Sequence, residues 1–140
     1  MTAEKNLETA GALYAAFGAG DADAFLALMA DDVQWESWAD NQAVAAGVPW
    51  LQPRQGKAGV LEFLGAASRM EITDLQILDM LAGDHQVAVE FVIEAKLPDC
   101  AGRTYRDEEV HLWSFDDEGK VTRLRHYTDT AKHIAAYTGS

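Results

Sequence analysis

The sequence predicts an α+β fold: a strongly curved, cone-shaped antiparallel sheet with three helices, all from the N-terminal half, packed on its concave face. Two observations lead to this fold class. Apolar residues recur with the helical period of about 3.6 in the first half of the chain and with the strand period of two from residue 71 onward. Turn-forming residues separate the segments of the second half. Helices that precede a run of consecutive strands are typical of α+β proteins.

The first half carries the three helices and one strand. A helix is predicted over residues 4–18, and the glycine at its end stops it. Asp21 can cap a second, short helix. Apolar and polar residues then alternate over 33–38, which predicts a strand. The apolar residues of 56–69 fall on one stripe, as expected for a third helix.

A long connection over residues 39–55 separates that strand from the third helix. It is rich in Ala and Gly and is predicted to be a loop, which at this length is typically mobile or functional. Trp50 lies within it. We expect Trp50 either to cover the mouth of the cone as a lid, which we favour, or to pack against the third helix. Asp40 would supply a carboxylate to the site if the loop folds inward.

The second half is predicted to form four strands and a final helical turn or two. Alternating segments indicate strands over 71–82, 86–97, 103–115 and 120–128, and residues 130–137 close the chain as a short helix. Consecutive strands joined by short turns form an antiparallel meander. A curved sheet of this kind, covered by helices, encloses a pocket.

Length and charge restrict the possible partners. The 140 residues fit one domain, spanning 1–140, and the formal net charge of −12 would repel a nucleic acid or an anionic membrane. The longest uncharged stretch, 41–53, is too short to span a membrane, and the N-terminus lacks the apolar run of a signal peptide. The single cysteine, Cys100, excludes an internal disulfide and a cysteine-based zinc cluster. We therefore expect a cytoplasmic protein that binds neither nucleic acid nor membrane.

Several motifs stand in an order that resembles a known superfamily. They are Tyr14-Ala15-Ala16-Phe17, Gly20-Asp21, Leu28-Met29-Ala30-Asp31-Asp32-Val33, Val110-His111-Leu112-Trp113-Ser114-Phe115 and Tyr127-Thr128-Asp129. The chain resembles the nuclear-transport-factor-2-like (NTF2-like) superfamily, and within it the SnoaL-like proteins related to polyketide cyclases and ketosteroid isomerases. For the fold this resemblance is specific. The superfamily hosts isomerases, lyases, hydrolases and non-catalytic proteins, so the function has to be argued from the site residues.

The catalytic positions of the ketosteroid isomerases are not kept. The resemblance aligns their oxyanion-stabilising tyrosine with Leu13, their general base with Ser37 and their second oxyanion donor with His111. Steroid isomerisation by that mechanism is therefore not expected. The polyketide cyclases pair a histidine, which His111 matches, with an aspartate that falls at Arg125 or His126. A histidine pair of this type is similar to that of scytalone dehydratase.

Strand parity places a polar and aromatic row on one face of the strand 103–115. Residues two apart share a face, so the alternate residues Val110, Leu112 and Ser114 form an opposite, apolar face. If the histidine side is concave, the apolar side is free to pair with a second copy of the chain. We therefore expect a homodimer through the convex sheet face. The row on the concave side would be Tyr105, Asp107, Glu109, His111, Trp113 and Phe115.

The register of the last hairpin decides which side chains meet His111. A four-residue loop, Asp116–Gly119, would place Glu109 opposite His126 and His111 opposite Leu124. Glu109 would then orient His126 and raise its basicity. A bulge in this hairpin would flip the parity and turn Arg123 and Arg125 inward instead.

A histidine pair in an aromatic cone suits proton transfer beside a carbonyl group. The reactions that fit are dehydration, double-bond isomerisation and intramolecular aldol cyclisation, none of which needs a metal or cofactor. His111 and His126 would transfer the proton on a small hydrophobic molecule, with Glu109 orienting one of them. The residues expected to shape the ligand pocket are Tyr14, Trp35, Ser37, Trp50, Trp113, Leu124 and Thr128.

Simpler interpretations of the same residues remain open. The two histidines could be hydrogen-bonded polar residues of a partly wet interior, and Glu109 could lie on a solvated edge. The protein would then be a non-catalytic ligand-binding or assembly protein that keeps the fold. His85 and His133 are expected on the surface and Cys100 in an exposed loop. The histidine spacing gives no metal-binding signal.

Overall fold

The computed structural model describes residues 2–37 and 40–140, with the side chain of residue 37 outside the described part. Residue 38, the predicted end of the first strand, also lies outside it. The elements, in chain order, are α1 (Ala3–Ala19), α2 (Ala22–Ala27), β1 (Met29–Ser37), α3 (Gln42–Ala45), the 3₁₀ turn η1 (Pro49–Leu51), β2 (Arg54–Gln55), α4 (Gly56–Ser68), β3 (Glu71–Ala82), β4 (Gln86–Leu97), the 3₁₀ turn η2 (Pro98–Cys100), β5 (Arg103–Phe115), β6 (Val121–Tyr127) and α5 (Thr130–Thr138).

The predicted α+β class is confirmed, with two differences. The connection predicted as a loop contains α3, η1 and β2, so it is largely structured. The six strands lie in the order β2-β1-β6-β5-β4-β3, and β1 pairs with β6 in parallel while the other neighbours are antiparallel. The sheet is therefore mixed. A parallel pair needs a long connection between its strands, and β1 and β6 have one because they lie far apart in sequence.

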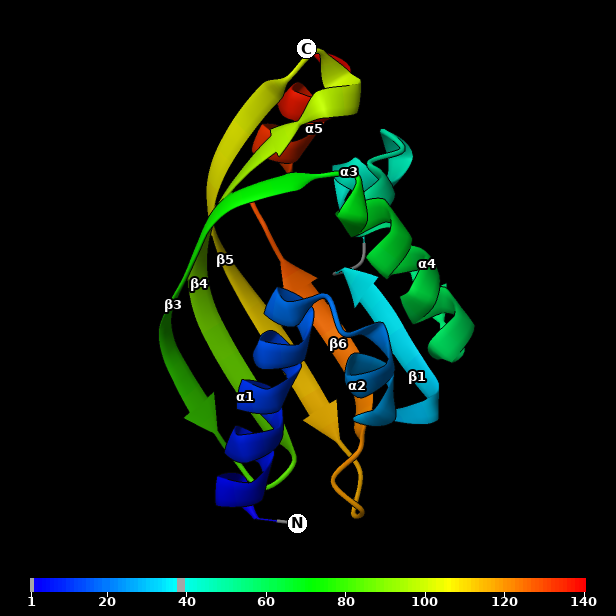
Figure 1. The fold of residues 1–140 in the computed structure, drawn as a ribbon, viewed down its shortest axis with the longest axis vertical. Coiled ribbons are helices and arrows are strands. Elements are labelled where there is room, and N and C mark those ends of the chain that lie inside the picture. Colours follow the sequence, from blue (N-terminus) through cyan, green and yellow to red (C-terminus); the bar gives the residue numbers. More distant parts are fainter. Residues whose placement is uncertain (1, 38–39) are drawn as a thin grey trace.

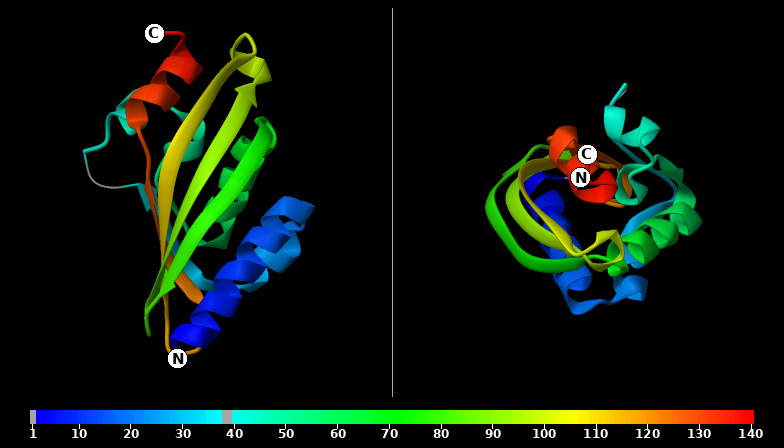
Figure 2. Two further views of the ribbon diagram at one scale, coloured as in Figure 1. Left: turned by 90° about the vertical axis from the view of Figure 1, so that its left-hand side faces the viewer. Right: turned by 90° about the horizontal axis from the view of Figure 1, so that it is seen from above.

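The long strands curve around the interior, and helices close it (Figures 1 and 2). In Figure 1, α1 and α2 cover the lower half of the sheet, α4 lies alongside β1, and α5 sits at the upper end beside α3. Local signals fix the helix ends. The Asp21 carboxylate accepts a hydrogen bond from the amide of Ala24 at the start of α2, and Gly20 ends α1 in the left-handed conformation, at φ 67°.

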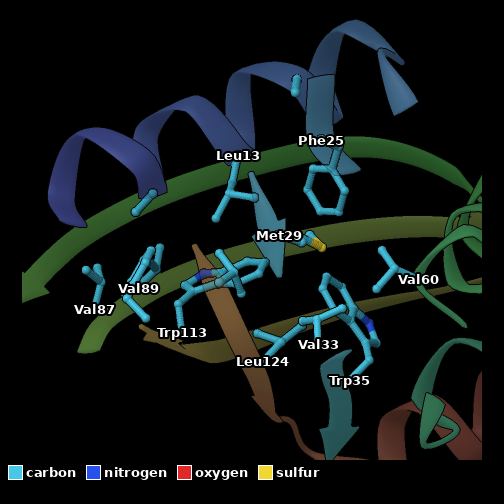
Figure 3. Close-up of a cluster of buried hydrophobic side chains, with 14 of the residues drawn as sticks. Leu13, Phe25, Met29, Val33, Trp35, Val60, Val87, Val89, Trp113 and Leu124 are labelled. Atoms are coloured by element: carbon cyan, nitrogen blue, oxygen red, sulfur yellow. The ribbon is translucent and has the colours of Figure 1, made fainter. Parts of the chain in front are cut away.

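Two apolar clusters fill the interior. The larger one occupies the lower half and includes Leu13, Phe25, Trp35 and Trp113, which point toward one another in Figure 3. The smaller one lies at the upper end and includes Trp50, Leu97, Tyr105 and Ala136. In the described part of the chain, no helix is long and apolar enough to cross a membrane.

The β5–β6 hairpin closes differently from the four-residue loop that the sequence predicts. Phe115 pairs with Val121, whereas Ser114 pairs with Arg123. The turn is thus one residue longer than predicted, and Thr122 is a further, bulged residue on β6. Each of these changes shifts the register by one residue.

Because the two shifts add up to two residues, each side chain of β6 stays on the face of the sheet that the sequence predicts. His126 therefore still faces the interior, as predicted, but the pairs Glu109–His126 and His111–Leu124 are wrong. His111 lies opposite His126, and Trp113 lies opposite Leu124. Glu109 becomes the diagonal neighbour of His126, and a long side chain can still reach across that diagonal.

Candidate active site

The concave row on β5 is confirmed by burial. Asp107 and Glu109 are among its buried members, although charged residues are seldom buried unless they are paired. The alternate residues Arg106 and Glu108 are exposed. The interpretation of Glu109 as part of a solvated edge is therefore wrong.

A cavity of about 70 Å³ lies against this row, lined on most sides by carbon. It borders both core clusters, and five of its lining side chains carry a hydroxyl, carboxyl or imidazole group. A cavity of roughly 150 Å³ holds benzene, so this one accepts only a smaller group unless side chains move. These five lining residues are Tyr14, Tyr105, Glu109, His111 and His126.

One polar branch joins Tyr14, His111 and Trp113. The Tyr14 hydroxyl is 2.6 Å from Nδ1 of His111 and accepts a hydrogen bond from Nε1 of Trp113 at 3.0 Å. Burial lowers the pKa of His111 well below its usual value, and His126 lowers it further, against the opposing charge of Glu109. Burial also raises the pKa of Tyr14 above its usual value. His111 is therefore a neutral imidazole beside a protonated phenol.

The second branch joins His126 to Glu109. Nε2 of His126 donates to Oε1 of Glu109 at 2.6 Å, a short, charge-assisted bond. Burial raises the pKa of Glu109, but the charge of His126 and the hydrogen bonds from His126 and His133 outweigh it and hold this pKa well below its usual range. Glu109 is thus ionised and fixes the orientation of the His126 ring.

His133 continues this branch to the upper end of the interior. Its Nε2 lies 2.8 Å from Oδ2 of Asp107 and 2.9 Å from Oε2 of Glu109, and its Nδ1 accepts a hydrogen bond from Nε1 of Trp50 at 2.8 Å. Burial lowers the pKa of His133, while the hydrogen bonds and charges of Asp107 and Glu109 raise it, and the net direction is upward.

The expectation that His133 lies on the surface is wrong. Its side chain is buried, because α5 folds back over the concave end of β5. The sequence carried one signal: Asp107 and Glu109 both fall on the buried face of β5, and two buried carboxylates require hydrogen-bond donors from elsewhere in the chain.

The two branches meet where His111 faces His126. Their ring centroids are 4.4 Å apart. Phe91, a residue that the strand pattern did not single out, packs on both rings, with its centroid 4.4 Å from that of His111 and 6.5 Å from that of His126. Ligand atoms of Glu109, His111 and His126 lie within 4.8 Å of one another. Both Glu109 oxygens already accept imidazole N–H groups, so the geometry is that of a hydrogen-bond network.

Most of the residues expected to shape the pocket line the cavity. Trp35, Trp50, Trp113 and Leu124 do so, together with Tyr14. Trp50 is buried and stacks on Tyr105, with ring centroids 6.1 Å apart, so it closes the upper end of the cavity as part of the core.

Two expected pocket residues do not contribute a described lining side chain. Thr128 follows the end of β6, where the chain leaves the sheet, and it is not among the lining residues. Ser37 pairs with His126 along the β1–β6 ladder, but its side chain lies outside the described residues. Asp40, expected to approach only if its loop folded inward, is also absent from the lining.

The remaining sequence expectations concern residues away from the cavity. Arg123 and Arg125 are not turned inward, because both guanidinium groups approach Glu36, at 2.5 Å and 4.0 Å. His85 is exposed, as expected. Cys100 is half-buried rather than exposed, because it packs against the upper apolar cluster.

Comparison with solved structures gives the class of the protein. The fold is that of the NTF2-like proteins: one from Burkholderia xenovorans LB400 matches with a TM-score of 0.84 and 25% identity over 98% of both chains. The chain belongs to the SnoaL-like family, because the model of the SnoaL-like domain matches residues 10–124.

Two further solved structures bear on function. A candidate polyketide cyclase from Xanthomonas campestris pv. campestris matches with a TM-score of 0.74 and 26% identity over 98% of this chain and 99% of its own. TerC, co-crystallized with polyporic acid, matches with a TM-score of 0.76 and 25% identity over 97% and 99%. No curated protein matches the sequence.

Proposed function

We propose that this protein binds a small hydrophobic carbonyl compound and catalyses a proton transfer on it without a cofactor, as in an isomerisation, dehydration or cyclisation. One observation carries the proposal. Two imidazoles, 4.4 Å apart, face one apolar cavity, and each has a ring nitrogen fixed by a different partner. Groups that transfer protons near neutral pH need such fixed tautomers.

The two imidazoles would take opposite roles. His111 is neutral. The base would be the tautomer that carries its hydrogen on Nδ1, toward the Tyr14 oxygen, and leaves the Nε2 lone pair free. His126 uses Nε2–H to hold Glu109, and with a second proton on Nδ1 it would act as the acid. A base removes the proton beside the carbonyl while the acid donates to the carbonyl oxygen, so the developing enolate is neutralised as it forms.

A larger ligand has a route into the cavity. A groove of about 590 Å³ lies between α1, α2 and α4, and it shares Phe17, Phe25 and Met70 with the cavity lining. Movement of these side chains would join the two spaces. The TerC complex makes polyporic acid the first compound to test.

The test is a thermal-shift screen of carbonyl compounds that begins with polyporic acid, followed by turnover assays of any compound that binds. Binding raises the melting temperature by mass action. We expect His111→Ala to abolish turnover by the folded protein and His85→Ala, at an exposed histidine, to leave it unchanged. Full turnover by His111→Ala would refute the assignment.

A non-catalytic ligand-binding protein is the second candidate. It is favoured by the small volume of the cavity, since the interior is largely filled by side chains. In that case a compound would stabilise the protein, His111→Ala would weaken its binding, and no product would form.

We also propose that the chain forms a homodimer through the convex sheet face. Val110 and Leu112 on that face of β5 are half-buried, and Leu81 of β3, which lies in the same cross-strand row as Leu112, is 67% exposed. Apolar side chains gathered in this way mark an interaction surface. Light scattering at micromolar concentration should give twice the chain mass, and a monomer mass would contradict the dimer.

A further inference from the structure

A second group of polar side chains lies behind His126, out of contact with the cavity. Asp107 and His133 are buried but do not line the cavity, and they come from β5 and α5. Asp107 also accepts a hydrogen bond from the amide of Asp129 at 3.0 Å. Burying two carboxylates, Asp107 and Glu109, is costly unless positive charge and hydrogen bonds compensate.

Trp50 determines what His133 can contribute. An indole N–H can only donate, so the Nδ1 that it contacts at 2.8 Å must keep its lone pair. His133 is then a neutral imidazole with its single hydrogen on Nε2. That hydrogen is shared between the oxygens of Asp107 and Glu109, at 2.8 and 2.9 Å. The two carboxylates favour a second proton on His133, but that proton could bind only at Nδ1 and would break the hydrogen bond from Trp50. With that bond intact, His133 gives the carboxylates a hydrogen bond but no charge.

The compensating charge must therefore come from another group. In the described residues, the ion pairs of Asp107 and Glu109 involve only His126 and His133. The other titratable groups that pack against the network, Tyr14, Tyr105 and His111, are protonated phenols and a neutral imidazole. His126 is therefore the imidazole that remains to carry the positive charge, and its Nε2 lies 2.6 Å from Oε1 of Glu109.

We propose that Trp50 and His133 hold the positive charge of this network on His126, so that a cationic His126 faces a neutral His111 across the cavity. Trp50, His133 and Asp107 are positioning residues in this arrangement. Trp50 lines the upper end of the cavity, whereas His133 and Asp107 do not line it. The catalytic use of this charge rests on the proposed function, in which the cationic His126 is the acid. Its test needs no substrate.

The test is ¹⁵N NMR of the histidine side chains in the full-length protein at neutral pH. Nitrogen shifts distinguish a neutral imidazole, and its tautomer, from a doubly protonated one. We expect His133 to be neutral with its hydrogen on Nε2, and His126 to be doubly protonated. A doubly protonated His133, or a neutral His126, would overturn the inference from the wild-type spectrum alone.

A matched pair of variants tests the role of the indole. Trp50→Phe removes the N–H donor and keeps a ring against Tyr105, so His133 becomes free to take a second proton and His126 should lose its charge. Trp113→Phe makes the same change on the other branch, where the donor serves Tyr14. It should alter the His111 signals and leave His126 doubly protonated. Unchanged His126 signals in Trp50→Phe would overturn the proposal.

These outcomes separate the inference from the proposed function. A cationic His126 in a protein that turns over none of the compounds that bind it would uphold the charge placement and refute the catalysis. Turnover that depends on His111 in a protein with a neutral His126 would do the reverse.

Discussion

At the scale of single residues, the site is defined by how each imidazole is held. His111 and His126 are the same residue type, on paired positions of adjacent strands, yet their partners are opposite in character. A phenol that is hard to ionise holds His111, and an ionised carboxylate holds His126. Environments that differ in this way are how proteins give two identical groups separate acid and base roles.

The pH dependence of stability provides a test of the neutral state of His111. Because the pKa of His111 is lowered in the folded protein, the unfolded chain binds the extra proton below about pH 6.5, its ordinary pKa, and folding loses free energy as the pH falls. For one such group the loss between pH 6.5 and 5.5 is about 1 kcal/mol, and it approaches about 1.4 kcal/mol per unit at lower pH. Urea unfolding of wild type and His111→Gln at pH 6.5 and 5.5 should show a smaller loss in the variant.

The matched control for this measurement is His85→Gln, in the exposed turn before β4. It should keep the wild-type loss between the two pH values. Glu109, whose lowered pKa makes its stabilisation fade only in more acidic solution, does not contribute in this window. Equal losses in wild type and His111→Gln would mean that folding does not lower the pKa of His111, and would contradict its neutral state in the folded protein.

At the scale of elements, α5 completes a network that begins on β5. Arg103, at the start of β5, anchors the end of this helix: its Nε donates to the carbonyl of Ala136 at 2.7 Å and its Nη2 to that of Tyr137 at 3.0 Å. The last carbonyls of a helix have no partners within the helix, and a cation there also complements the helix dipole. Arg103 thus keeps His133 at the buried carboxylates.

Arg103→Ala should therefore loosen α5 more than the rest of the fold. We expect a loss of about 1–3 kcal/mol in the free energy of unfolding, since two charged hydrogen bonds disappear. Hydrogen exchange should rise mainly in α5. Arg106→Ala, in the same strand, removes only an exposed ion pair with Glu94 and should cost less than about 1 kcal/mol. Equal effects of both variants would contradict the anchoring role.

The elements also show what the sequence can predict. The bounds of β3, β4 and β5 and the inward row on β5 follow from a period of two, which is a local property of the chain. The sequence predicts the inward position of His126 correctly, although the predicted register is wrong. The longer turn and the Thr122 bulge each shift the register by one residue, so together they leave His126 on the same face. The place of His133 depends on how α5 docks. Docking is a tertiary property that the periodicity of a short helix does not contain.

At the scale of the whole molecule, one cavity connects the two apolar clusters and determines which ligands fit. Its volume of about 70 Å³ is set largely by aromatic rings, among them Phe91, whose side chain is fully buried and packs on His111. Phe91→Ala would add the volume of a benzene ring to this space. Such a change costs roughly 3–5 kcal/mol of stability, because lost contacts add to the cavity that remains.

The enlarged cavity gives a prediction with a simple probe. A dry, apolar cavity of roughly 150 Å³ binds benzene, so benzene should raise the melting temperature of Phe91→Ala and leave that of the wild type nearly unchanged. Val92→Ala is the control, because Val92 follows Phe91 on β4, is buried, and does not line the cavity. It should lose less stability and show no response to benzene. If benzene stabilises neither variant, the space vacated by Phe91 does not join the cavity beside His111. The ligand would then have to enter by displacing the aromatic side chains of the groove between α1, α2 and α4.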